Sequence, residues 1–425
     1  MNIAIAYGRG RIKFSLPKRR VLGVLKNKVA RGDSVRDLTV TALRRPLNGV
    51  SFDDLMVGKN NILVAVPDNT RSAHLKDILP VLLRRIESKG RAITIVAATG
   101  LHKSHDGPEL RSLVGKAIFK SYRVKSHTQD ERSLIDFGRT SKGVPVVLNR
   151  MVRDCDLIIS VGVIEPHLYA GYSGGAKTVA IGLAGKVTID HTHGTRFLDD
   201  RSTRIASIDG NLFQDTLWEI AAKTPLGFSV NVVNDPDGTA AAVFAGSPRD
   251  VFEKGVKLAK KIFEVTVVKE GGIVICGIGY PKDINLYQSS RAINYVANVD
   301  RPVISKGGVI VVAAELRDGI GLSQAEKLFY KNLCVMRSPR QLVEEVRREG
   351  CVAGKHRAYM LAAPLMDYKV IFVTASSKKG FMRNLPFETF SSIRKAILRA
   401  EDIVGRDAGV YVIPKALATV AIRRI

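Results

Sequence analysis

The 425-residue chain has few aromatic residues and little cysteine. Aromatic side chains make up 6% of it, with one tryptophan, which is few for a surface on which nucleic-acid bases stack. Its four cysteines form no CxxC pair; they are Cys155, Cys276, Cys334 and Cys351. Such isolated cysteines argue against a disulfide framework and a structural zinc site, and they fit a reducing, cytoplasmic setting.

The chain also lacks a long apolar run. No stretch approaches the roughly 18 residues that a membrane-spanning helix needs. The first 14 residues alternate like a strand, without the charged leader and apolar run of a signal peptide, so none is expected. The composition, with 45% hydrophobic and 25% charged residues, excludes wholesale disorder and a fibrous protein. A chain of this length is expected to form two or three globular domains.

Acidic residues are too few to balance the basic ones. Lys and Arg number 66 against 40 Asp and Glu, a formal net charge of +26. One interpretation is a nucleic-acid-binding surface, and the other is a generally basic or salt-adapted surface. The basic residues come in twos and threes over the whole chain and form no long arm, which favours the second interpretation. We therefore expect neither a nucleic-acid nor a membrane partner.

Short apolar runs alternate with amphipathic segments along the chain, which is typical of layered α/β architecture. Strands are expected at residues 61–66, 92–98, 157–163, 265–268, 272–276, 308–314, 370–374 and 409–414. Helices are expected at residues 75–86 and 288–297, and residues 257–264 lead up to the domain boundary. The pattern predicts an N-terminal domain over residues 1–268 and a C-terminal domain over residues 269–404. Residues 405–425 form a return segment that can join the first domain.

Histidines are concentrated in one part of the chain. Seven of the eight fall between His74 and His193, and several follow the carboxyl ends of expected strands, where open α/β sheets bind ligands. His102 and His167 hold such positions and can act there as acids or bases. His105 and His191 are expected to be supporting or surface residues, and His74 and His127 are expected to be solvated. No HExxH or cysteine pair accompanies any of them, so a conventional zinc site is not indicated.

The densest segment, residues 165–178, reads EPHLYAGYSGGAKT. It nearly matches the phosphate-binding loop GxxxxGK[ST], because Gly171, Lys177 and Thr178 are in place. Ala176 stands where that loop needs glycine, and the preceding strand ends about seven residues too early. A glycine-rich loop with one lysine can still hold a phosphate or form a covalent bond. The alternative function is therefore a phosphate- or nucleic-acid-binding protein that uses this segment and the basic surface.

The same segment resembles the signature of the lactate racemase family, whose enzymes use a nickel-pincer nucleotide. Further matches follow in the family's order: residues 68–71 (DNTR), 99–102 (TGLH), 188–193 (TIDHTH), 279–288 (GYPKDINLYQ) and, more weakly, 315–321 (ELRDGIG). The resemblance extends over most of the chain. It implies two α/β domains, each a sheet layered with helices, with the cofactor and active site in the cleft between them.

The resemblance also implies a role for each matched residue. His102 and His167 correspond to the catalytic acid–base pair. Lys177 corresponds to the lysine that attaches the cofactor covalently, a pyridinium-3-thioamide-5-thiocarboxylic acid mononucleotide carrying nickel. His193 corresponds to the nickel ligand, a donor suited to that metal. The family's reaction is the racemisation or epimerisation of a 2-hydroxy acid through reversible hydride transfer to the cofactor.

The remaining matches imply contacts to substrate and cofactor. Arg71, Gln288 and Arg291 are expected to bind the substrate, with the planar guanidinium of Arg71 suited to its carboxylate. Cofactor contacts are expected from Asp68, Thr70, Gly174 and Gly175. The enzymes that build the cofactor are expected partners, because a chain produced without them would lack it.

Two departures from the family lie on the substrate side. Lactate-specific members carry lysine at the position of Arg291, and a tryptophan in the second domain that is missing from residues 351–359. The only tryptophan, Trp218, lies on an apolar helical stripe and is expected in the core. The loss of a bulky ring and the gain of a forked cation predict a roomier, more anion-tolerant pocket. Malate-like diacids and sugar acids are therefore as plausible as lactate.

A protein of this fold that binds the nucleotide without catalysis is disfavoured by the intact histidines and lysine.

Overall fold

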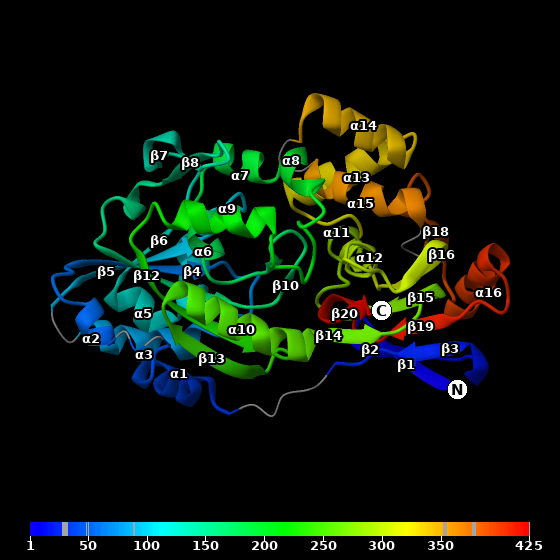
Figure 1. Cartoon of the computed structure of the whole chain (residues 1–425), viewed down its shortest axis with the longest axis horizontal. Helices are drawn as coiled ribbons and strands as arrows, with labels where there is room; N and C mark the ends of the chain where they lie inside the picture. The colour runs from blue at the N-terminus through cyan, green and yellow to red at the C-terminus, as the bar shows by residue number, and fades with distance from the viewer. Residues whose placement is uncertain are drawn as a thin grey trace. The chain divides into compact units, whose positions relative to one another are not determined.

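The computed structural model describes residues 1–27, 33–47, 49, 51–87, 90–351, 355–375 and 380–424. The chain divides into two compact units, each with its own six-stranded sheet (Figure 1). The N-sheet unit comprises Lys28–Thr192 and Ile208–Ile262, and the C-sheet unit comprises Met1–Asn27, His193–Ser207 and Phe263–Ile425. Among the described residues, no helix combines the length and the apolar character needed to cross a bilayer.

In the N-sheet unit the strand order is β13-β12-β9-β4-β5-β6. The strands are β4 (Asn61–Pro67), β5 (Ala92–Ala98), β6 (Arg123–Ser126), β9 (Leu157–Val163), β12 (Leu226–Asn234) and β13 (Ala240–Gly246). All neighbours are parallel except β12 and β13. Two antiparallel hairpins accompany the sheet, β7 (Leu134–Arg139) with β8 (Pro145–Asn149), and β10 (Pro166–His167) with β11 (Gly171–Tyr172).

Helices cover both faces of this sheet. They are α1 (Val35–Arg44), α2 (Phe52–Leu55), α3 (Leu75–Glu87), α4 (Gly107–Val114), α5 (Lys116–Ser121), α6 (Lys177–Ala180), α7 (Lys186–Thr192), α9 (Leu212–Ala221) and α10 (Pro248–Phe263). Ile62, Val64 and Val66 project from one face of β4, because alternate strand residues point the same way. They form a buried core with Ile78 and Leu82 of α3.

The C-sheet unit holds a parallel sheet in the order β18-β17-β16-β15-β19-β3. Its strands are β3 (Val21–Val24), β15 (Gly271–Gly277), β16 (Ile304–Ala313), β17 (Lys369–Val373), β18 (Glu388–Phe390) and β19 (Val410–Ile413). The hairpin β1 (Asn2–Tyr7) and β2 (Gly10–Ser15) and the pair β14 (Glu264–Val267) and β20 (Val420–Arg423) belong to the same unit. The helices are α8 (Thr195–Leu198), α11 (Leu286–Ser289), α12 (Arg291–Ala297), α13 (Gln324–Val335), α14 (Pro339–Glu349), α15 (His356–Asp367) and α16 (Ile393–Val404).

The predicted α/β class and the expected strands are confirmed, with shifts of a few residues at their ends. The division into units differs from the single boundary expected at residue 268. Ile3 and Ile5 of the N-terminal hairpin are buried in the core of the C-sheet unit, and β3 pairs with β19. The return segment, residues 405–425, supplies β19 and β20 to that same unit and not to the N-terminal one.

Gly182 is packed too closely against β5 to accept a side chain. A Cβ there would lie 2.6 Å from the Cβ of Ala98 and 2.3 Å from the carbonyl oxygen of Thr178. We predict that Gly182→Ala lowers the free energy of unfolding by about 1–3 kcal/mol, because overpacking a tight contact forces the backbone apart. Chemical denaturation measures this loss. The matched control is Gly107→Ala, where the nearest atom is 3.9 Å away; equal losses in both variants would contradict the steric explanation.

Candidate active site

The carboxyl ends of three neighbouring strands deliver the expected site residues. β9, β4 and β5 lie side by side in the sheet of the N-sheet unit. Asp68 follows β4, the loop with His102 follows β5, and Glu165 and His167 follow β9. Because the strands are parallel, these loops meet at one edge of the sheet, the edge at which open α/β sheets bind ligands.

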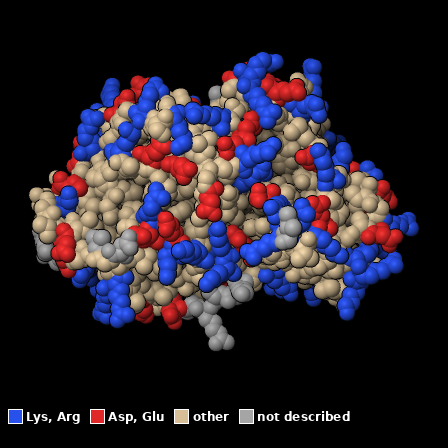
Figure 2. All heavy atoms as spheres, in the orientation of Figure 1, with Lys and Arg blue, Asp and Glu red and all other residues tan. Residues whose placement is uncertain are grey.

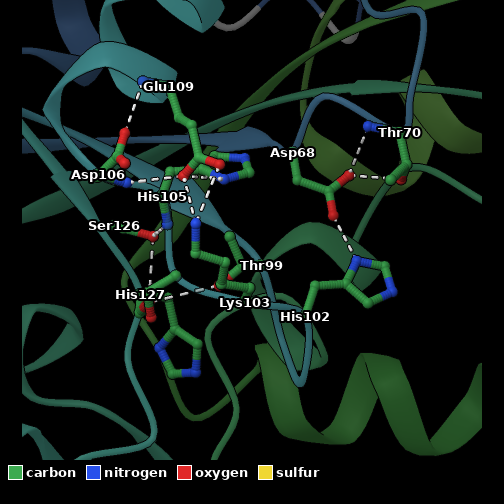
Figure 3. Close-up of polar contacts among 11 residues, drawn as sticks. Asp68, Thr70, Thr99, His102, Lys103, His105, Asp106, Glu109, Ser126 and His127 are labelled. Carbon is green, nitrogen blue, oxygen red and sulfur yellow. Dashed lines mark hydrogen bonds and ion pairs between the residues drawn. The ribbon is translucent and has the colours of Figure 1, made fainter. Parts of the chain in front are cut away.

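Asp68 holds His102 in a fixed orientation. The Oδ2 atom of Asp68 lies 2.5 Å from Nδ1 of His102, and its Oδ1 accepts hydrogen bonds from the backbone N–H (3.1 Å) and hydroxyl (2.5 Å) of Thr70 (Figure 3). The carboxylate is buried, whereas the His102 side chain is 65% exposed. Nδ1 of His102 is therefore occupied by its hydrogen bond to Asp68, and Nε2 lies on the exposed side of the ring.

The Asp68 carboxyl stays ionised over the whole physiological range. Burial opposes its ionisation, but the hydrogen bond and charge of His102 outweigh burial, assisted by the Thr70 hydroxyl and the charge of Arg71. Together they lower the pKa of Asp68 to about 2. An ionised partner at Nδ1 keeps the proton on that nitrogen and makes Nε2 the basic atom of His102.

Lys177 completes a charged cluster with Asp68, Arg71 and Glu165. Arg71 Nη1 donates to Glu165 Oε1 at 2.5 Å. Burial lowers the pKa of Lys177 to about 7, helped by the nearby charge of Arg71 and opposed by Asp68 and Glu165. A large fraction of the Lys177 amine is therefore neutral, and nucleophilic, near neutral pH.

The turn before Lys177 requires glycine. Gly174 has a φ of +93°, and a Cβ there would lie 2.5 Å from Oδ1 of Asn231. The same Oδ1 accepts a hydrogen bond from the Gly175 N–H at 3.0 Å. The turn is thus fastened to β12, and Lys177 begins α6 directly after it. The sequence did not predict a role for Asn231. No motif marks this residue, because it lies on a strand and contacts the site only by accepting a hydrogen bond from the backbone of Gly175.

His167 has a different environment from His102. The backbone N–H groups of Tyr169 and Ala170 donate to its Nδ1, each at 3.3 Å. Its ring packs edge-on against the ring of Tyr169. Two donors at Nδ1 favour a lone pair on that nitrogen and place the proton of the neutral ring on Nε2. The two histidines therefore present opposite protonation states at Nε2.

The segment from Gly171 to Thr178 does not fold as a phosphate-binding loop. Gly171 and Tyr172 form the short strand β11, paired with β10, and the following helix α6 has four residues. A phosphate-binding loop connects a strand directly to a full helix whose N-terminus faces the phosphate. On the face drawn in Figure 2, acidic side chains interrupt the basic ones. These observations count against the alternative of a phosphate- or nucleic-acid-binding protein.

The expected nickel ligand lies in the C-sheet unit. The His193 ring packs edge-on against the His356 ring, with centroids 5.5 Å apart. Burial, and then the charges of His193 and Arg357, lower the pKa of His356 well below its ordinary value. No group of three or more His, Cys, Asp or Glu side chains among the described residues is placed to hold a metal ion. The sequence did not predict the contact between His356 and His193, because the two residues are far apart in the chain and come together only in the folded structure.

The two other expected substrate contacts also lie in the C-sheet unit. Arg291 Nη1 donates to Gln288 Oε1 at 3.2 Å. Nearby, the buried Arg357 donates from Nη2 to the carbonyl oxygen of Tyr287 at 3.4 Å and stacks on the Tyr287 ring. Its buried Nη1 has no hydrogen-bond partner among the described residues. Residues 352–354 of the stretch that lacks the family tryptophan lie outside the described part of the chain.

Two expectations about single residues need correction. His127 was expected to be solvated, but it is fully buried, and burial lowers its pKa to about 4. Its ring bonds to Asn149 and to the carbonyl oxygen of Ala184, which a buried neutral imidazole needs. Trp218 was expected in the core; it is partly exposed, with its ring against Phe252.

The sequence of the chain matches two domain models of one protein family. Residues 7–205 match the lactate racemase N-terminal domain, and residues 265–421 match the lactate racemase C-terminal domain. A lactate racemase of Thermoanaerobacterium thermosaccharolyticum is 28% identical over 428 residues, which cover 99% of each chain. A lactate racemase of Lactiplantibacillus plantarum is 28% identical over 400 residues, 93% of this chain and 92% of that one.

Solved structures agree with the sequence comparisons. The lactate racemase apoprotein of T. thermosaccharolyticum superposes with a TM-score of 0.91 at 28% identity and covers 99% of this chain and 100% of its own. A protein from Thermotoga maritima shares the fold, with a TM-score of 0.69 at 16% identity. The chain therefore belongs to the lactate racemase family, and it is an enzyme of the isomerase class.

Proposed function

We propose that the chain racemises or epimerises a 2-hydroxy acid with the help of a nickel-pincer nucleotide attached to Lys177. The observation that carries the proposal is the charged cluster, in which a largely buried lysine of lowered pKa lies among Asp68, Arg71 and Glu165. Asp68 of this cluster also holds His102 by a hydrogen bond. The names of the two curated relatives, both lactate racemases, support the same reaction type.

The residues present fit this cofactor. A lysine whose pKa is about 7 can attack an activated acyl or thioacyl group at neutral pH. Imidazole is a good donor for nickel, which suits His193. The nucleotide is proposed to supply the other nickel donors. When bound, the cofactor supplies a reversible acceptor for the hydride on the carbon that bears the hydroxyl group.

His102 is proposed to take the hydroxyl proton as that hydride leaves. Asp68 fixes the proton of the neutral ring on Nδ1, so the Nε2 lone pair faces outward as the base. The Asp68 carboxylate also stabilises the imidazolium that forms. General base catalysis of this kind contributes roughly 10²–10⁴-fold to the rate.

His167 is proposed to serve the opposite face of the planar 2-keto acid. Its proton on Nε2 lets it donate a hydrogen bond to the oxygen that is being reprotonated. Arg71 is proposed to bind the substrate carboxylate. A guanidinium has five N–H donors, so Arg71 can keep its contact with Glu165 while it binds a second carboxylate in a planar fork.

We propose a substrate with more polar groups than lactate, a malate-like diacid or a sugar acid. Arg291 and Gln288 form a hydrogen-bonded pair, and the buried Arg357 lies beside Tyr287 with an Nη1 that lacks a partner among the described residues. A buried cationic donor without a partner is costly, and an additional substrate carboxylate or hydroxyl group would satisfy it. Lactate offers no such group.

The first prediction for the site concerns the Asp68–His102 pair. In enzyme loaded with cofactor, Asp68→Asn should lower kcat by about 10²-fold or more, because the amide neither fixes the tautomer nor stabilises an imidazolium. Steady-state racemisation followed by polarimetry measures the loss, and circular dichroism checks the fold. The control is Asp53→Asn, which removes an exposed carboxylate paired with Arg85. An unchanged kcat in Asp68→Asn would rule out the proposed role of His102 as the base.

The second prediction concerns the Lys177 amine. A lowered pKa means that the amine is mostly neutral above pH 7 and mostly charged below it. Modification of Lys177 by an amine-reactive ester should therefore rise with a midpoint near pH 7, as measured by peptide mass spectrometry on cofactor-free protein. Replacing Arg71 with Gln removes a charge that lowers the pKa, so the midpoint should move upward. A midpoint near the ordinary lysine value of about 10.4 would contradict the proposal.

The third prediction concerns substrate choice. Replacing Arg291 with Lys removes the forked cation, and it should raise the ratio of kcat/KM for lactate to kcat/KM for malate by about tenfold. Competition assays with both acids measure the ratio. Arg340→Lys, an exposed substitution on α14 of the same unit, serves as the control. If the ratio stays the same in Arg291→Lys, Arg291 does not select the substrate.

A further inference from the structure

A cavity of about 410 Å³ lies in the N-sheet unit, apart from the charged cluster. Its floor is formed by the first residues of β4 and β5 and by the edge strand β6, and its walls by the segments after β6 and β8. Leu63, Thr94 and Arg123 are register partners across the three strands, so they project from the same face of the sheet. None of Asp68, Arg71, His102, Glu165 or Lys177 lines this cavity.

The cavity is lined by four basic side chains and one acidic one. The basic residues are Arg123 and Lys125 on β6, Arg132 after it and Arg150 after β8, and the acidic one is Asp154. In the described part of the chain none of the four forms an ion pair. By contrast, other basic residues of the same unit pair with carboxylates, among them Arg85, Lys142 and Lys186.

Neutral donors complete the lining. Thr94 and Ser133, which carry hydroxyl groups, also line the cavity. Its volume falls within the range of roughly 300–1,000 Å³ found for small-molecule pockets. Several basic groups of one sign around a shared space attract anions and repel each other. A ligand with two or more negative charges offsets this repulsion and uses the hydroxyl donors as well.

We propose that this cavity binds a small polyanion, a metabolite with two or more phosphate or carboxylate groups, at a site separate from the reacting centre. Its wall is connected to the His102 loop. Asn149, a lining residue, donates from Nδ2 to Nδ1 of the buried His127 at 3.1 Å. The Thr99 hydroxyl in turn donates to the carbonyl oxygen of His127 at 3.4 Å, as Figure 3 shows. An occupant of the cavity would thus lie next to Asn149, which is connected through His127 to Thr99 in the loop of the proposed base.

Isothermal titration of the cofactor-free full-length chain tests the proposal. The probes are inorganic pyrophosphate and citrate, which separate phosphate from carboxylate recognition, with inorganic phosphate for comparison. At least one of the two polyanions should bind with a stoichiometry of one per chain. The double variant Arg123→Gln/Arg150→Gln should weaken this binding at least tenfold, since each lost charge removes a direct contact. Thermal melting verifies that the variant folds, and Arg132→Gln provides a second, milder variant.

Two control variants test whether the polyanion binds in this cavity. The double variant Arg111→Gln/Lys120→Gln removes two exposed charges of the same unit that lie outside the cavity, and it should leave the affinity within about twofold. The same holds for Lys177→Ala, which alters the charged cluster. Loss of binding in Lys177→Ala would assign the anion to the reacting centre and overturn the proposal. Equal weakening in all the charge variants, or no binding of either polyanion, would overturn it too.

Discussion

The burial of one lysine among other charges is the constraint on which the site depends. Lys177 follows a turn that only glycine can form at Gly174, and Asn231 fastens this turn to β12. The amine therefore lies beside Arg71, and burial and that charge together lower its pKa to about 7. A lysine in water would be almost fully protonated at this pH and a poor nucleophile. The fold thus creates the reactivity on which the proposed attachment of the cofactor depends.

Two imidazoles with opposite environments complement this lysine. An ionised carboxylate fixes His102 with Nε2 as the basic atom, whereas two backbone N–H groups favour a proton on Nε2 of His167. Both arrangements arise because loops after parallel strands meet at one edge of the sheet. The same sheet offers a different surface elsewhere, where four basic residues line a cavity that contains none of these groups. One sheet therefore carries two sites of different chemistry.

Local sequence patterns predicted much of the fold, and they marked the residues of the candidate site that stand next to strand ends. Buried strands such as β4, β5 and β9 are continuous apolar runs, which is why their ends were placed almost correctly. The unit boundaries were not predictable, because the pairing of β3 with β19 joins segments nearly 400 residues apart. The burial of His127 and the partner roles of Asn231 and His356 likewise arise from contacts between distant segments, which periodicity and spacing do not encode.

The most direct test of cofactor attachment at Lys177 is the intact mass and nickel content of the chain produced together with the enzymes that build the cofactor. Attachment predicts a nucleotide-sized increase in mass that maps to Lys177 by peptide mass spectrometry, with about one nickel per chain. The Lys177→Ala chain, produced in the same way, should show no such increase. An unmodified wild-type chain, obtained while another lactate racemase is modified under the same conditions, would contradict the central claim.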